Sequence, residues 1–81
     1  MPTIYRESGF RYFFYSNEGN EPSHVHIEGK GGEMKIWLEP FGIEFAYGLS
    51  PRDQRVIVDA VSKNMKLFKE KWDGFTAQKS K

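Results

Sequence analysis

Apolar and polar residues alternate over the first half of the chain, which is the spacing of β-strands. Two short runs rich in β-branched and aromatic residues, 3–6 (TIYR) and 10–15 (FRYFFY), flank the turn sequence Ser8-Gly9. The second run is apolar on both faces. We therefore expect it to lie inside a sheet and not at its edge.

Three more alternating runs follow a polar loop. Residues 24–28 and 34–39 surround the sequence GKGG and predict a β-hairpin. A further run, GIEFAY, begins after Pro40. This run alternates once more, with Ile43, Phe45 and Tyr47 on one side.

The pattern changes to helical spacing after Gly48. Ser50 is a favourable N-cap, Pro51 suits the first helical position, and Asp53 suits the positive end of the helix dipole. Apolar residues then recur at steps of three and four, forming one stripe: Ile57, Val61, Met65, Phe68 and Trp72.

Gly74 predicts the end of this helix, which would span about residues 51–73 and leave a loose tail at 76–81. We expect a single domain over residues 1–81. Its fold class is α+β: an antiparallel sheet of four or five strands within residues 3–47, with one C-terminal amphipathic helix packed on one face.

The predicted hairpin determines which side chains share a surface. Apolar residues must meet apolar residues if one side covers the core. The most symmetric register then pairs His24 with Trp37 and His26 with Lys35. A slip by two residues changes the pairs but not the faces. The face away from the helix carries His24, His26, Glu28, Lys35, Trp37 and Glu39.

We expect this face to be exposed, and an exposed Trp37 needs a partner or a cover. Either the histidines and Trp37 form a functional surface, or the loop at residues 17–22 or a second subunit covers them. In the second case the imidazoles are only hydrogen-bonded.

Composition and charge exclude several classes. The chain has no cysteine, so disulfides, thiolate metal sites and thiol nucleophiles are absent. There is no signal-peptide pattern and no apolar run near the roughly 18 residues of a membrane span, so we expect a cytoplasmic protein. Basic residues concentrate after residue 50, but they alternate with acidic ones at four-residue steps. That pattern indicates a solvated helix face, not a nucleic-acid interface.

One hypothesis for the hairpin surface is cleavage of RNA without a metal. His24 and His26 would supply the general base and acid, and Lys35 the cation for the phosphate. Trp37 would stack on a base, and Arg11 would add a phosphate contact.

A second hypothesis is a metal site formed by His24 and His26 with Glu28, or with Glu44 from the next strand. Lys35 argues against it, because a like charge disfavours a bound cation. No cofactor is expected, since GKGG lacks the spacing of a phosphate-binding loop.

A third hypothesis is a non-catalytic interaction domain. Trp37 would anchor a protein partner or an identical subunit, with charged residues such as Glu39 around it.

Several short motifs resemble a known family. The order of EGNEP, HVHIE, WLEP and GLSPR, with FRYFFYSNEG before them, is similar to the small bacterial family called domain of unknown function 4160, over residues 1 to about 73. Many members have two prolines before the first histidine, where this chain has Pro22-Ser23. The gene neighbourhood of the family looks like a toxin–antitoxin pair. The resemblance therefore implies a toxin–antitoxin-type component that works through a protein encoded nearby, with action on RNA as one option.

Overall fold

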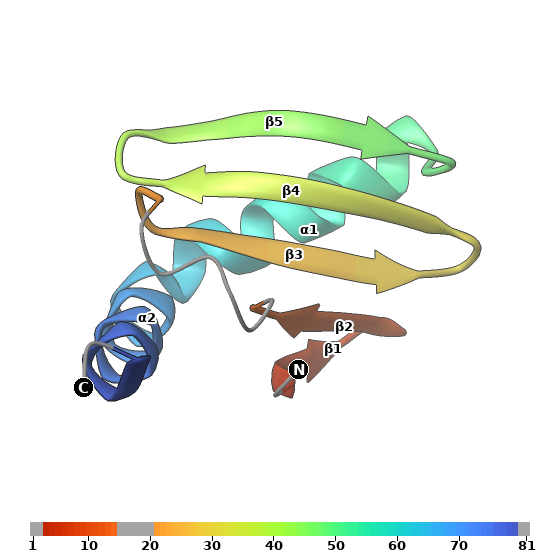
Figure 1. Ribbon diagram of the computed structural model, residues 1–81. Helices are drawn as coiled ribbons and strands as arrows, with labels where there is room; N and C mark the ends of the chain where they lie inside the picture. Colours follow the sequence, from red (N-terminus) through yellow and green to blue (C-terminus); the bar gives the residue numbers. More distant parts are fainter. Residues whose placement is uncertain (1–2, 15–20, 80–81) are drawn as a thin grey trace.

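The structure is a computed structural model that describes residues 3–14 and 21–79. Its five strands and two helices follow one another along the chain (Figure 1): β1 Thr3–Glu7, β2 Phe10–Phe13, β3 His24–Gly29, β4 Gly32–Leu38, β5 Phe41–Tyr47, α1 Pro51–Lys63 and α2 Met65–Lys79. The strands form one antiparallel sheet in the order of the sequence. The predicted α+β class and antiparallel sheet are confirmed.

The turns explain why neighbouring strands pair. Both Ser8 and Gly9 adopt positive φ values, 56° and 84°, and so do Lys30 and Gly31, at 51° and 80°. Two consecutive residues of this kind give the turn whose twist matches a β-hairpin. Glycine at the second position adopts it without steric cost.

β5 departs from the predicted regular strand. The register shifts between Lys35 and Ile36 of β4, so that Ile43 lies opposite Ile36 and Phe45 lies opposite Lys35. Glu44 is the extra residue of this β-bulge. The prediction that Ile43 shares a face with Phe45 is therefore wrong, because the inserted residue reverses the faces.

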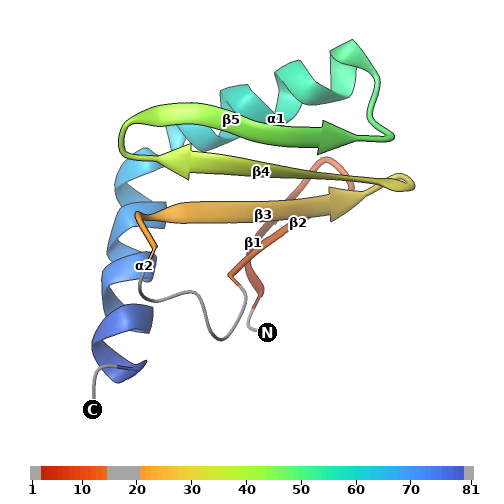
Figure 2. The same cartoon turned by 45° about the horizontal axis from the view of Figure 1, so that its top comes forward.

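One cluster of buried apolar residues joins the sheet to the helices: Phe10, Tyr12, Phe14, Val25, Ile27, Met34, Ile36, Leu38, Ile57, Ala60, Val61, Phe68 and Trp72. In both views the helices lie on one side of the sheet, and α2 passes the end at which β3 begins (Figure 2). The helical stripe predicted from the sequence is buried in this cluster, except that Met65 is half-buried.

The C-terminal half forms two helices and not the single one expected. α1 begins as predicted, with Ser50 Oγ accepting from the Asp53 amide at 3.1 Å. It ends at Asn64, whose φ of −115° is not helical. The Asn64 side chain donates to the Ala60 carbonyl at 2.7 Å. An asparagine that binds a helix carbonyl in this way competes with the regular backbone ladder.

α2 continues through Gly74 to Lys79, so the expected stop at Gly74 and the loose tail are wrong for residues 76–79. A glycine inside a helix costs only about 1 kcal/mol, which packing can offset. Here Phe75 packs against Phe14 at a centroid distance of 5.4 Å. Within the described ranges, no helix is long and apolar enough to cross a membrane.

Candidate functional site

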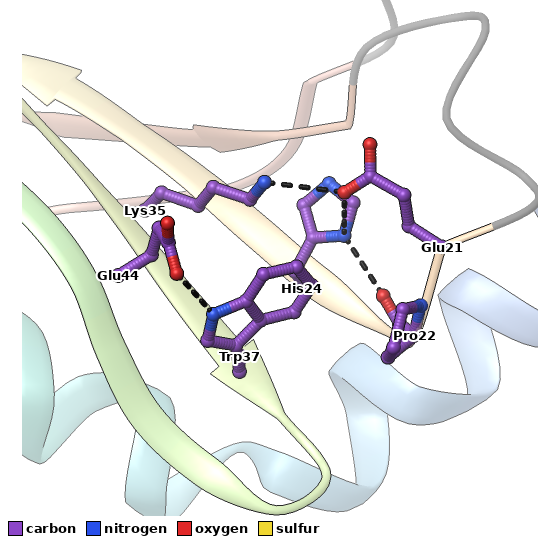
Figure 3. Close-up of polar contacts among 6 residues, drawn as sticks. All are labelled: Glu21, Pro22, His24, Lys35, Trp37 and Glu44. Atoms are coloured by element: carbon purple, nitrogen blue, oxygen red, sulfur yellow. Dashed lines mark hydrogen bonds and ion pairs between the residues drawn. The ribbon is translucent and has the colours of Figure 1, made fainter.

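β3 and β4 place both histidines and Trp37 on the same face of the sheet, opposite to the face formed by Val25 and Ile36. His24 lies directly across from Trp37, and His26 across from Lys35. The predicted register is confirmed. Figure 3 shows the cluster formed around His24 at the start of β3.

The imidazoles are buried, whereas we expected from the sequence that they would be exposed. His24 is 0% exposed and His26 is 8% exposed, while Trp37 is half-buried. The His26 ring stacks on Phe13 of β2, with centroids 5.7 Å apart. The sequence could not show this cover, because Phe13 reaches the site only through the pairing of β2 with β3.

His24 also lies between the two tryptophans of the chain. Its ring centroid is 5.3 Å from that of Trp37 and 4.8 Å from that of Trp72 on α2. Its Nδ1 lies 2.9 Å from the Pro22 carbonyl oxygen. A carbonyl oxygen can only accept, so Nδ1 carries the proton in this contact. His24 thus connects the outer face of the sheet to α2.

Charged side chains complete the cover (Figure 3). Glu21 Oε1 lies 3.2 Å from Lys35 Nζ and 4.0 Å from His24 Nδ1. Lys35 Nζ also lies 4.4 Å from the centre of a Trp37 ring. The Trp37 indole N–H donates to Glu44 Oε1 at 2.7 Å, and Glu44 is the extra residue of the β-bulge. Lys35 and Trp37 are therefore already engaged within the chain.

The other predicted site residues, Arg11, Glu28 and Glu39, also form ion pairs within the chain. Arg11 Nη1 pairs with Glu28 Oε1 at 2.5 Å, and the guanidinium lies 4.3 Å from the centre of the Phe13 ring. Glu39 lies 3.7 Å from Lys69 Nζ. Among the residues that the structure describes, no group of three histidine or acidic side chains is arranged to hold a metal ion. The geometry gives the set of His24, His26 and Glu28 no support.

Comparison with known proteins places this chain in a family. The family model described as Domain of unknown function (DUF4160) matches residues 9–73. The chain belongs to this family. No curated protein and no solved structure matches it. The match to DUF4160 covers both the histidine cluster and most of the helical region, but its description assigns no activity.

A second surface of this DUF4160 domain was not singled out from the sequence. In the part of the chain that the structure describes, every exposed large apolar residue lies on β5: Phe41 at 42%, Ile43 at 50% and Tyr47 at 65%. β5 is an edge strand, paired only with β4. The signal was present, because the last strand of a sheet built in sequence order is an edge and this one carries four large apolar residues, Phe41, Ile43, Phe45 and Tyr47.

A groove of about 600 Å³ lies beside this edge, between Ile43 and α1. Pro51 and Val58 contribute apolar surface to it, and Arg55 and Asp59 contribute opposite charges. A smaller hollow of about 280 Å³ lies near the C-terminal end of β4 and is lined by Pro22, Trp37, Glu39 and Pro40. Within residues 3–14 and 21–79, the exposed large apolar side chains therefore gather at β5 and not at the histidines.

Proposed function

We propose that this chain is a non-catalytic protein-interaction domain that binds an extended segment of a protein partner at the free edge of β5. The observation that supports this proposal is the concentration of exposed apolar side chains on that one strand. An edge strand presents unpaired backbone N–H and C=O groups that a second strand can pair with. Side-chain contacts with Phe41, Ile43 and Tyr47 would add specificity.

The two edges of the sheet differ in a way that favours β5. β1 has five residues, and its exposed side chains are Thr3, Arg6 and Glu7. Charges of this kind protect an edge against pairing. β5 has seven residues, three of them exposed and apolar.

The burial of the histidines argues against a ribonuclease. A general acid or base must come within hydrogen-bonding distance of the reacting atoms. His24 and His26 are covered by rings and by Glu21, and Lys35 is paired with Glu21. We assign this cluster a structural role, which is to hold the start of β3 against α2.

The biological setting that we propose rests on family resemblance alone. The gene neighbourhood of DUF4160 proteins looks like a toxin–antitoxin pair. The partner at β5 would then be a protein of that module, either the product of the neighbouring gene or a second copy of this chain, and the complex would work in the cytoplasm.

Site-specific photo-crosslinking in cells tests the β5 proposal. A photoreactive phenylalanine analogue would replace Tyr47 on β5 and, as a matched control, Arg6 on β1. We expect a crosslinked product from position 47 and none from position 6. The product should disappear when Ile43→Lys is added, because a lysine charge would face the groove.

The captured chain would then be identified by mass spectrometry and purified. Its affinity should fall by about tenfold or more with Ile43→Lys, the loss typical of a well-packed apolar contact. It should not change with Lys66→Asp on the exposed side of α2. Equal crosslinking from both edges, or a product that ignores Ile43→Lys, would reject the proposal.

A further inference from the structure

We propose that a second copy of this chain occupies the edge of β5, in a two-fold symmetric dimer in which Arg55 of each copy pairs with Asp59 of the other. This inference rests on the proposed function, because it names the partner at the same edge. It follows from the side of α1 that lines the groove.

α1 carries two different faces. One face packs on the sheet through Ile57, Ala60 and Val61. The other face lines the groove beside Ile43 and is small or apolar at Pro51, Val58 and Ser62. With Gln54 and Arg55 between them, the lining positions recur at steps of three or four residues, which is the spacing of a face that packs against a second helix.

The charges on this second face complement each other. Arg55 is exposed, and it forms no ion pair within residues 3–14 and 21–79. Asp59 is one helical turn further along, with its side chain 62% exposed and its Oδ2 3.0 Å from Lys63 Nζ. A two-fold axis that passes between Arg55 and Asp59 would place Arg55 of each copy opposite Asp59 of the other copy. The same surface therefore complements itself.

The sheet permits the same symmetry. A two-fold axis perpendicular to the sheet at its edge makes β5 of the two copies antiparallel and keeps both α1 helices on one side. The sheet would continue from one copy into the other. Ile43 and Val58 would be covered in both copies, and the unpaired backbone groups of the edge would find partners.

Charge reversal tests the pairing of Arg55 with Asp59. Analytical ultracentrifugation should show a concentration-dependent dimer for the unaltered chain. Arg55→Asp and Asp59→Arg should each raise the dissociation constant by about tenfold or more, because like charges then face each other across the axis. An equimolar mixture of these two variants should regain the dimer, since opposite charges meet again at both contacts.

Matched controls separate this effect from changes in net charge or folding. Lys66→Asp and Glu70→Arg alter the charge by the same amounts on α2, and they should leave the dissociation constant within about twofold. Asp59→Arg also removes the ion pair with Lys63, so circular dichroism should confirm that each variant is folded.

Two outcomes would overturn the inference: a chain that stays monomeric up to about 1 mM, the limit of weak association, or two variants whose mixture fails to restore the dimer. If Tyr47 then crosslinks to a different protein in a manner that depends on Ile43, the proposed function stands and only the second copy is rejected. If no such product forms, both proposals fail.

Discussion

His24 connects three elements of the molecule, β3, β4 and α2. Its ring touches Trp37 on β4, His26 on its own strand and Trp72 on α2. It has no exposed surface, and its Nδ1 contacts the Pro22 carbonyl. A side chain in this position acts as part of the core, although its chemistry first suggests catalysis.

We expect His24→Ala to lower the free energy of unfolding by about 2–4 kcal/mol, because truncating a buried ring leaves a cavity among the surrounding rings. Urea unfolding followed by tryptophan fluorescence would measure this change. Lys66→Ala on the exposed side of α2 is the control, and it should stay within about 0.5 kcal/mol. A loss as small as that of the control would show that the His24 ring is not packed as described.

Tyr12 differs from His24 in that its buried polar group, the hydroxyl, has no hydrogen-bond partner among the described residues. Burial, followed by the negative charge of Glu7, raises the pKa of Tyr12 to about 12. We expect Tyr12→Phe to leave stability unchanged or to raise it by about 1 kcal/mol, because the variant loses no hydrogen bond.

The raised pKa of Tyr12 also predicts a pH dependence. The unfolded side chain deprotonates near its ordinary pKa of 10.0, whereas the folded one stays neutral until about 12. Its contribution to stability is therefore complete below pH 10 and declines from there to pH 12. Urea unfolding of the unaltered chain and of Tyr12→Phe, at intervals from about pH 8 upward, should give free energies whose difference is constant up to about pH 10 and grows above it, because only the unaltered chain loses the Tyr12 contribution there. Parallel curves would contradict the assignment.

At the scale of elements, the beginning of α1 is determined by a single side chain. Ser50 Oγ accepts from the Asp53 amide, which would otherwise lack a partner in the first turn. Ser50→Ala should destabilise the protein by about 1 kcal/mol, and Ser50→Gly by only a few tenths, as N-cap replacements do. Thermal unfolding of the two variants would test this order. Equal losses would indicate that the hydrogen bond contributes nothing.

The elements also show how far the sequence could be interpreted. The pairing of His24 with Trp37 was predictable, because strand side chains alternate strictly and only one parity brings the apolar residues together. The bulge at Glu44 was not, since one inserted residue leaves no trace in a short apolar run. The break at Asn64 depends on a side-chain hydrogen bond that competes with the helix ladder. The burial of the histidines depends on Phe13 and Trp72, which lie far from them in the sequence.

At the scale of the whole molecule, one cross-strand pair joins a residue that serves stability to a residue that we expect to serve interaction. Ile36 and Ile43 lie opposite each other, but Ile36 is 0% exposed and Ile43 is 50% exposed. Ile36→Ala should cost about 2–5 kcal/mol, whereas Ile43→Lys should change the free energy of unfolding by less than about 1 kcal/mol. Chemical denaturation of both variants, alongside crosslinking from Tyr47, would test this separation. A large loss for Ile43→Lys would show that the residue serves folding and not binding.

The sequential order of the five strands has a consequence for synthesis of the chain. Each strand pairs with the one made just before it, so every pairing closes a short segment. Topologies dominated by such local contacts fold fast. The sheet can therefore assemble hairpin by hairpin as the chain leaves the ribosome. Its apolar face nevertheless stays bare until α1 and α2 have been made, because they come last and cover it. A chain that ended after Tyr47, without α1 and α2, would thus leave this apolar face uncovered and open to any chaperone that binds apolar surfaces.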